Sequence, residues 1–410
     1  MRTRAKGAAM QKKALVLIES STTGHLFHHA AKRLGYVPIL LSEDAERYRG
    51  LGLIDPVAVF ANTLSVEAVI EVCQRLQSTY EIKGILSSSG AYAAVAAGVS
   101  RFFGLPGADP DAVAQCQNKF EQRTRLKAAG LATPAYRYVT DPHNAVEFAD
   151  AIGLPVIVKP VVGSGSMGVR LCTALPEVSA QTSYLLREED FASSPGVLVE
   201  QYIVGPEFSV ETMGQNVIGV TAKHLGPLPF FVEIGHDFPA HLSTQVKQEI
   251  ATAVTTAISA LGLQWGPAHT ELRLGPEGPV IIEVNPRIAG DFIPQLVRLA
   301  YGLDLIKEAI KLVVSDAVDL TAPANQCAGI RFLNPGSDGV LRWHCDVALA
   351  RSVEGIVEVE LYAPDGSQIR RRGDFRDRIG HVIALTSQAA QTDSALESAL
   401  ALLDVRIEAQ

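Results

Sequence analysis

Strand-sized apolar runs alternate with helical stretches in the N-terminal part of the chain. The apolar runs cover residues 14–18, 37–41, 58–60 and 84–87. Strands that alternate with helices predict a parallel sheet with both faces covered. Ligands of such sheets bind at the carboxyl ends of the strands. This rule places Ser20–Gly24 and Ser87–Tyr92 at the rim of a candidate substrate site.

The pattern changes after the two glycines and the proline of Gly104–Gly107. A helix is expected over residues 112–130, and a smaller α+β unit runs from Pro134 to about Gly205. Strands and helices then return as far as about Leu305. The remainder contains strand-like segments and a final helix, which cover residues 329–332, 356–361, 381–385 and 393–403.

A glycine-rich segment follows the apolar strand that carries Lys159. Its glycines match the GxGxxG pattern and are Gly163, Gly165 and Gly168. Residues 169–172 are typical of a second strand, whereas a dinucleotide-binding loop opens a helix, so we interpret the segment as a hairpin with a polar tip. Its backbone N–H groups can approach phosphate oxygens, and Ser164, Ser166 and the lysine add further donors. A mobile surface hairpin is the alternative.

A second hairpin is predicted around the turn at Gly275–Gly278. Glu271 lies on its first strand, and Glu283 and Asn285 share one face of the second because alternate residues of a strand do so. Two carboxylates and an amide oxygen suit Mg²⁺ held between protein and nucleotide phosphates. For either acid alone, an edge-strand glutamate is the alternative. Arg287, just beyond the strand, can clamp a phosphoryl group or a substrate carboxylate.

Composition narrows the classes of function. A chain of 410 residues predicts two or three domains, and its net charge of -8 argues against binding to a nucleic-acid backbone. The apolar runs are too short to span a bilayer. Five scattered cysteines are typical of reduced thiols in a cytoplasmic protein. The basic segment 1–13 is expected to be a flexible leader.

In their order along the chain, these residues resemble the ATP-grasp superfamily. The landmarks are Lys119 on the helix before the first hairpin, Lys159 on its strand, the segment 197–209, and the late acidic hairpin. The resemblance covers nearly the whole chain. It implies an α/β ATP-grasp fold with an N-terminal Rossmann-like parallel-sheet domain, a central α+β lid subdomain and a C-terminal α+β domain. The expected parts are a leader at 1–13, the N-terminal domain at 14–110, a nucleotide-binding region at 111–310 with the lid at about 134–205, and a C-terminal domain at 311–410 that completes the fold.

The resemblance also implies roles for individual residues. ATP would be bound by Lys119, Lys159, Gly163, Ser164, Gly165, Ser166, Gly168, Glu200, Tyr202, Ile203 and Glu207. Two Mg²⁺ ions, with Mn²⁺ as an alternative, would be held by Glu271, Glu283 and Asn285. The catalytic residues would be Arg287 and Lys159. Substrate would be contacted by Arg287, Gly290, Asp291, His269 and Lys223, although a structural role for His269 remains equally open.

Within the superfamily, residues 285–294, 299–304 and 377–383 are most similar to the L-amino-acid ligases that make dipeptides, often in peptide antibiotic pathways. The resemblance implies an ATP-dependent ligase that joins a small-molecule carboxylate to an amine through an acyl phosphate, with neither nucleic acid nor membrane as partner. Related ligases are commonly homodimers. Asp291 stands where that group often carries an apolar residue, and we expect it to pair with a substrate amine. A purine-pathway or D-alanine-type ligase and a non-catalytic ATP-binding regulatory protein are the alternatives.

Overall fold

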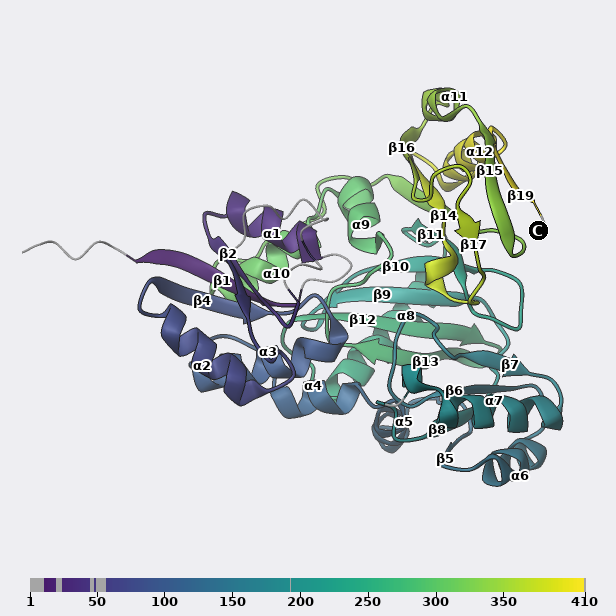
Figure 1. Ribbon diagram of the computed structural model, residues 1–410, viewed down its shortest axis with the longest axis horizontal. Coiled ribbons are helices and arrows are strands. Elements are labelled where there is room, and N and C mark those ends of the chain that lie inside the picture. Colours follow the sequence, from purple (N-terminus) through teal and green to yellow (C-terminus); the bar gives the residue numbers. More distant parts are fainter. Residues whose placement is uncertain (1–10, 20–23, 45–47, 49–56, 192, 409–410) are drawn as a thin grey trace, which may run out of the picture.

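The computed structural model describes residues 11–19, 24–44, 48, 57–191 and 193–408 (Figure 1). Most of the expected leader, and the part of the substrate rim at Ser20–Thr23, lie outside these residues. Lys12 and Lys13, which we expected to belong to the leader, begin the first strand. Within the described ranges, every helix is too short or too polar to cross a membrane.

The N-terminal part is the predicted parallel sheet. Its strands, in the order β3-β2-β1-β4, are β1 (Lys12–Ile18), β2 (Val37–Ser42), β3 (Val57–Phe60) and β4 (Tyr80–Leu86). Residues 14–18 of β1 are all buried, because helices cover the sheet. The helices of this part are α1 (Gly24–Arg33), α2 (Val66–Leu76) and α3 (Gly90–Phe102).

The single helix expected over residues 112–130 is two helices, α4 (Pro110–Cys116) and α5 (Lys119–Ala128). The helical conformation is interrupted at Asn118, whose backbone is extended. Its side-chain oxygen caps α5 by accepting hydrogen bonds from two backbone N–H groups. Asparagine favours such caps over helix interiors, which explains the break. The cap also places Lys119 at the start of α5, beside the first hairpin.

A small antiparallel sheet with two helices forms the lid, at the lower right of Figure 1. In the order β5-β8-β6-β7, its strands are β5 (Tyr136–Val139), β8 (Val197–Gln201), β6 (Val156–Pro160) and β7 (Arg170–Cys172). The helices α6 (Pro142–Ile152) and α7 (Leu175–Arg187) pack on it, followed by the short turn η2 (Glu189–Phe191). The glycine-rich segment joins β6 to β7, which are antiparallel partners, as the hairpin interpretation predicts.

A large antiparallel sheet forms the centre of the molecule. Its order is β13-β12-β9-β10-β11-β14-β18-β16. The strands nearer the lid are β9 (Glu207–Met213), β10 (Asn216–Leu225), β11 (Glu233–Phe238), β12 (Pro267–Gly275) and β13 (Gly278–Asn285). The helix α8 (Thr244–Ala260) packs on them, whereas α9 (Ile293–Tyr301) and α10 (Leu305–Val313) connect the large sheet to the N-terminal part.

The C-terminal part supplies the other three strands of the large sheet, β14 (Cys327–Leu333), β16 (Ile356–Leu361) and β18 (Gly380–Thr386). Its remaining elements are β15 (Gly339–Cys345), α11 (Val347–Ser352), β17 (Gln368–Ile369), η3 (Phe375–Asp377), α12 (Ala389–Leu400) and β19 (Leu403–Glu408). The final helix ends earlier than expected because β19 follows it. Alternating exposure along β19 is typical of a half-buried strand.

Candidate active site

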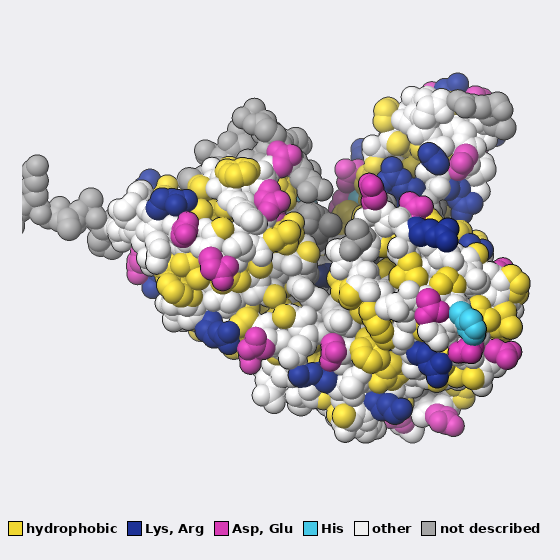
Figure 2. Space-filling view, turned by 60° about the horizontal axis from the view of Figure 1, so that its bottom comes forward, with side chains coloured by type: hydrophobic (Ala, Val, Ile, Leu, Met, Phe, Trp, Pro, Cys, Tyr) yellow, Lys and Arg dark blue, Asp and Glu magenta, His cyan; other side chains and the backbone are white. Residues whose placement is uncertain are grey.

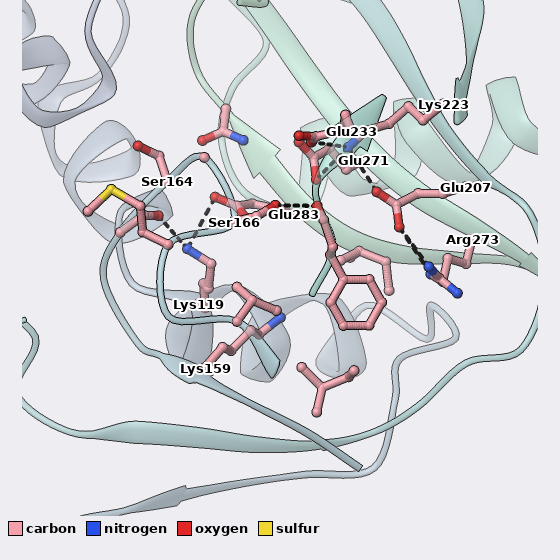
Figure 3. A pocket seen from close by; sticks show the side chains of 18 of the residues that line it. Lys119, Lys159, Ser164, Ser166, Glu207, Lys223, Glu233, Glu271, Arg273 and Glu283 are labelled. Atoms are coloured by element: carbon pink, nitrogen blue, oxygen red, sulfur yellow. Dashed lines mark hydrogen bonds and ion pairs between the residues drawn. The ribbon is translucent and has the colours of Figure 1, made fainter. Parts of the chain in front are cut away.

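One cavity between the lid and the large sheet brings nearly all the predicted site residues together. Figure 3 shows side chains from both sheets pointing into it. Of the predicted residues, Gly168 alone lies outside its lining. A Cβ at Gly168 would lie 2.7 Å from Leu185 and 2.9 Å from Phe191, so this position serves packing within the lid.

The acidic hairpin forms as predicted. Glu271 and Glu283 are direct partners across β12 and β13, and Asn285 also lines the cavity. Like charges placed opposite each other are destabilising unless cations lie nearby. Lys223 Nζ lies 3.3 Å from Glu271, and Lys119 Nζ lies 3.3 Å from Glu283. Two facing carboxylates and an amide oxygen are a donor set that fits a divalent cation.

His269 is buried between two acids. Its Nδ1 lies 2.7 Å from Glu211 and its Nε2 lies 3.2 Å from Glu271. Burial opposes the charged imidazole, but the two carboxylates outweigh it and raise the pKa of His269 to about 9. At neutral pH the ring is therefore a cation that orients Glu271.

Lys223 stands at the centre of three carboxylates, as Figure 3 shows. Its Nζ lies 2.8 Å from Glu207, 3.2 Å from Glu233 and 3.3 Å from Glu271. Burial disfavours the charged amine, but these acids outweigh it and raise the pKa of Lys223 well above its usual range. The three donors of an ammonium match the three acceptors, so Lys223 holds these carboxylates together. Glu233 escaped the sequence analysis because no motif surrounds it.

Glu200 is the anchor of a second ionic group. Lys159 Nζ and Arg123 Nε each lie 2.6 Å from its carboxylate, and all three side chains are at most 5% exposed. Burial raises the pKa of Glu200, but the two cations outweigh burial and hold it below the usual value. Burial, with Arg123 and Lys119 nearby, lowers the pKa of Lys159 despite Glu200.

The tip of the lid hairpin is fixed to the rest of the cavity wall. Lys119 Nζ donates to the carbonyl of Gly163 at 2.6 Å, and Ser166 Oγ donates to the carbonyl of Phe231 at 2.9 Å. Ser166 has a φ of 60°, a left-handed conformation that few residues other than glycine adopt. Ser164 and Gly165 also line the cavity, so the tip covers the lysines.

Arg273, which the sequence did not suggest, ties together three of the predicted ATP contacts. Its guanidinium donates to Tyr202 Oη at 3.0 Å and to the carbonyl of Ile203 at 3.1 Å. It also pairs with Glu207 at 3.0 Å. Arg273 lies two residues after Glu271 on the same strand, and that spacing was a signal that could have revealed it.

Arg287 lies where β13 leaves the sheet, and its Nη1 donates to the carbonyl of Ile288 at 2.9 Å. A Cβ on Gly90 would lie 3.5 Å from Arg287 Nε, so the start of α3 lies directly beside this arginine of the cavity lining. Asp291, expected to pair with a substrate amine, is already held by both Nη atoms of Arg378 at 2.9 Å.

The molecular surface carries charges of both signs. In the face shown in Figure 2, Lys, Arg, Asp and Glu are scattered over both lobes, and a notch separates the N-terminal lobe from the C-terminal part. A continuous basic area, which a nucleic-acid backbone requires, is absent from the described residues on this face.

Comparison with known proteins identifies two family regions in the chain. The ATP-grasp domain matches residues 152–295, and the L-amino acid ligase C-terminal domain 2 matches residues 331–408. The chain is 39% identical over 399 residues to the uncharacterized protein y4rH of Sinorhizobium fredii, covering 97% of this chain and 84% of that protein. It is 25% identical over 276 residues to the L-arginine-specific L-amino acid ligase of Bacillus subtilis, covering 65% of this chain and 66% of that ligase.

Solved structures share the fold. The L-amino acid ligase of Bacillus licheniformis superposes with a TM-score of 0.80 at 21% identity, over 98% of this chain and all of that one. The biotin carboxylase domain of the Hydrogenobacter thermophilus 2-oxoglutarate carboxylase, solved with MgADP and bicarbonate, gives a TM-score of 0.71 at 18% identity, over 98% and 92% of the two chains.

Proposed function

The chain belongs to the ATP-grasp superfamily and, within it, to the L-amino acid ligase type, and from that premise we propose that it joins the carboxylate of one amino acid to the amine of a second. The proposal rests on the cavity as well as on the family. Mg²⁺, the usual companion of ATP in this superfamily, would be held by the facing oxygens of Glu271, Glu283 and Asn285.

The proposed reaction has two steps. A substrate carboxylate attacks the γ-phosphorus of ATP, which gives an acyl phosphate and ADP. The amine then attacks the acyl carbon, and inorganic phosphate leaves as the amide forms. Lys119 and Lys159, beneath the lid tip, would bind the phosphates, while Arg287 would neutralise the negative charge on the tetrahedral intermediate. Such chemistry needs positioning and charge neutralisation more than covalent help from the protein.

One observation carries the proposal: Glu271 and Glu283 face each other in the same cavity as Lys119, Lys159 and the glycine-rich lid tip. Two opposed, partly buried acids are costly in a sheet that has only a structural role. The same acids are useful where a divalent ion and a triphosphate bind between them and the lysines.

ADP release tests the proposal. The purified protein is incubated with ATP, Mg²⁺ and pairs drawn from a panel of L-amino acids, and products are identified by mass spectrometry. We expect ADP and a dipeptide for at least one pair, and none when either amino acid is omitted. ADP release with D-alanine alone would favour a D-alanine-type ligase. ATP binding without ADP release for every pair would contradict the proposal and favour a non-catalytic binding protein.

A further inference from the structure

The C-terminal part meets the cavity lining from behind through Arg378, which contacts the lining residues Asp291 and Glu233. The residue follows η3, whereas its partner Asp291 lies in the loop between β13 and α9. Arg378 Nη1 and Nη2 each donate to one Asp291 oxygen at 2.9 Å, a bidentate pair. Asp291 and the following Phe292 both have a positive φ, of 53° and 64°. The pair therefore holds a backbone conformation that is rare for these residue types.

Arg378 is fixed from several directions. Its guanidinium lies 3.7 Å from the ring centroid of Phe332, and its Nη2 also donates to the carbonyl of Glu233 at 3.1 Å. Only 7% of its side chain is exposed. The segment before it is anchored on the lid, because a Cβ on Gly165 would lie 2.7 Å from the ring of Phe375. Arg378 does not itself line the cavity; it is held directly behind Asp291 and Glu233, which do.

Asp291 remains accessible from the cavity, since 32% of its side chain is exposed there. Burial would raise its pKa, but Arg378 and His236 outweigh burial and hold the pKa of Asp291 well below its usual range. A substrate that reaches this point thus meets a carboxylate whose charge is already neutralised. The buried imidazole of His236 lies on the same carboxylate, with its Nε2 3.7 Å from Asp291.

We propose that Arg378 is a specificity-determining residue: by neutralising Asp291, it makes this end of the cavity select carboxylate substrates whose side chains carry no net charge. The inference rests on the proposed ligase function. It replaces the expectation that Asp291 pairs directly with a substrate amine. Removing Arg378 takes the bidentate cation from Asp291, and removing Asp291 leaves Arg378 with the Glu233 carboxylate alone, at 3.4 Å. Either change shifts the local charge by one unit in a partly buried site, so a substrate group of the opposite sign should bind there more strongly.

Two single substitutions with opposite signs test this role. ADP release is measured with hydroxylamine as the amine, so that only the acid varies among L-norleucine, L-lysine and L-glutamate, which are similar in length. Arg378→Gln takes the bidentate partner from Asp291, and the kcat/KM ratio of lysine to norleucine should rise roughly tenfold. Asp291→Asn leaves Arg378 with only one carboxylate partner, Glu233 at 3.4 Å, and the ratio of glutamate to norleucine should rise by a smaller factor. The double variant restores neutrality and should reverse both changes.

Arg376→Gln is the matched control. Arg376 lies on the same segment and pairs with Asp374 at 2.6 Å, outside the cavity lining. It should leave both ratios at their wild-type values. Circular dichroism checks the fold, and if Arg378→Gln does not fold, the Asp291→Asn ratio decides alone.

The possible outcomes distinguish a failure of this inference from a failure of the proposed ligase function. A wild-type protein that releases no ADP with any acid contradicts the proposed ligase function. A wild-type protein that prefers lysine or glutamate to norleucine overturns the inference and leaves the ligase function intact. So does an equal loss for all three acids in both single variants, because that pattern belongs to a purely structural pair.

Discussion

Around Glu200 the two cations lie 2.6 Å from the carboxylate, whereas around Glu271 and Glu283 the cations lie at 3.2–3.3 Å. The first group is almost completely buried, and the two acids of the second are 22% and 15% exposed. Two cations that share one buried carboxylate at 2.6 Å hold neighbouring elements together. The longer contacts of the second group leave its acids able to exchange a protein cation for a bound metal ion.

A substitution in the Glu271 and Glu283 group should therefore have the largest effect on turnover. We predict that Glu283→Gln lowers kcat for ADP release by about a thousandfold at saturating ATP and Mg²⁺, because it removes a metal ligand while keeping the side-chain shape. The measurement is ADP release with the best pair from the amino-acid panel. Glu277→Gln, at the exposed turn of the same hairpin, is the control and should retain full activity. A Glu283→Gln enzyme with a tenth of wild-type activity would refute the role of this acid.

A substitution in the Glu200 group should have the largest effect on stability. Arg123 is fully buried, and its Nη2 also donates to the carbonyl of Ile282 at 2.6 Å. Arg123→Met should lower the free energy of unfolding by about 3–5 kcal/mol, because the buried Glu200 carboxylate and the carbonyl of Ile282 each lose a hydrogen-bond donor. Urea unfolding measures the loss. Arg101→Met, which removes an exposed pair at 3.5 Å from Asp111, should cost less than about 1 kcal/mol. Equal losses of unfolding free energy in the two variants would contradict the prediction that the buried pair stabilises the protein more than the exposed one.

The residues of the site also differ in how readily they can be predicted from the sequence. Glu271 and Glu283 face each other because a short turn joins neighbouring strands, and alternation along a strand fixes which side chains share a face. Arg378 contacts Asp291 from 87 positions away, through a loop with no motif. Its place depends on how the C-terminal strands join the large sheet, and no local pattern encodes that. Glu233 and the strand β19 could not be predicted from the sequence for the same reason.

A third ionic group is centred on Asp237 of β11, outside the cavity lining. It therefore tests how ion pairing affects stability without the contribution of a bound substrate or metal ion. Its carboxylate contacts Arg331 at 2.7 Å and His224 at 2.5 Å. Burial raises the pKa of Asp237, but these partners outweigh burial and hold the pKa below its ordinary value. Because the folded pKa is the lower one, the stabilisation is complete above the unfolded pKa and is lost as pH falls through the folded value.

Asp237→Asn should therefore lower stability by about 1–2 kcal/mol near pH 7, and its difference from wild type should shrink below about pH 4. Urea unfolding across this pH range measures the change. Saturating ATP with Mg²⁺ should stabilise both proteins equally. A difference that persists unchanged at acid pH would mean that the carboxylate charge of Asp237 is not what stabilises the fold.

The smallest effect is expected at the lid tip, and it separates two roles for one hydroxyl. Ser166 Oγ donates to the carbonyl of Phe231, so its single proton is already used within the protein. A second anchor between the same segments, from Leu171 N to the carbonyl of Pro229 at 3.0 Å, remains when the hydroxyl is removed. Ser166→Ala should then raise KM for ATP about threefold, the worth of one net hydrogen bond, with kcat nearly unchanged. If kcat falls more than tenfold in steady-state assays, the hydroxyl must instead turn toward the reacting phosphate when ATP binds.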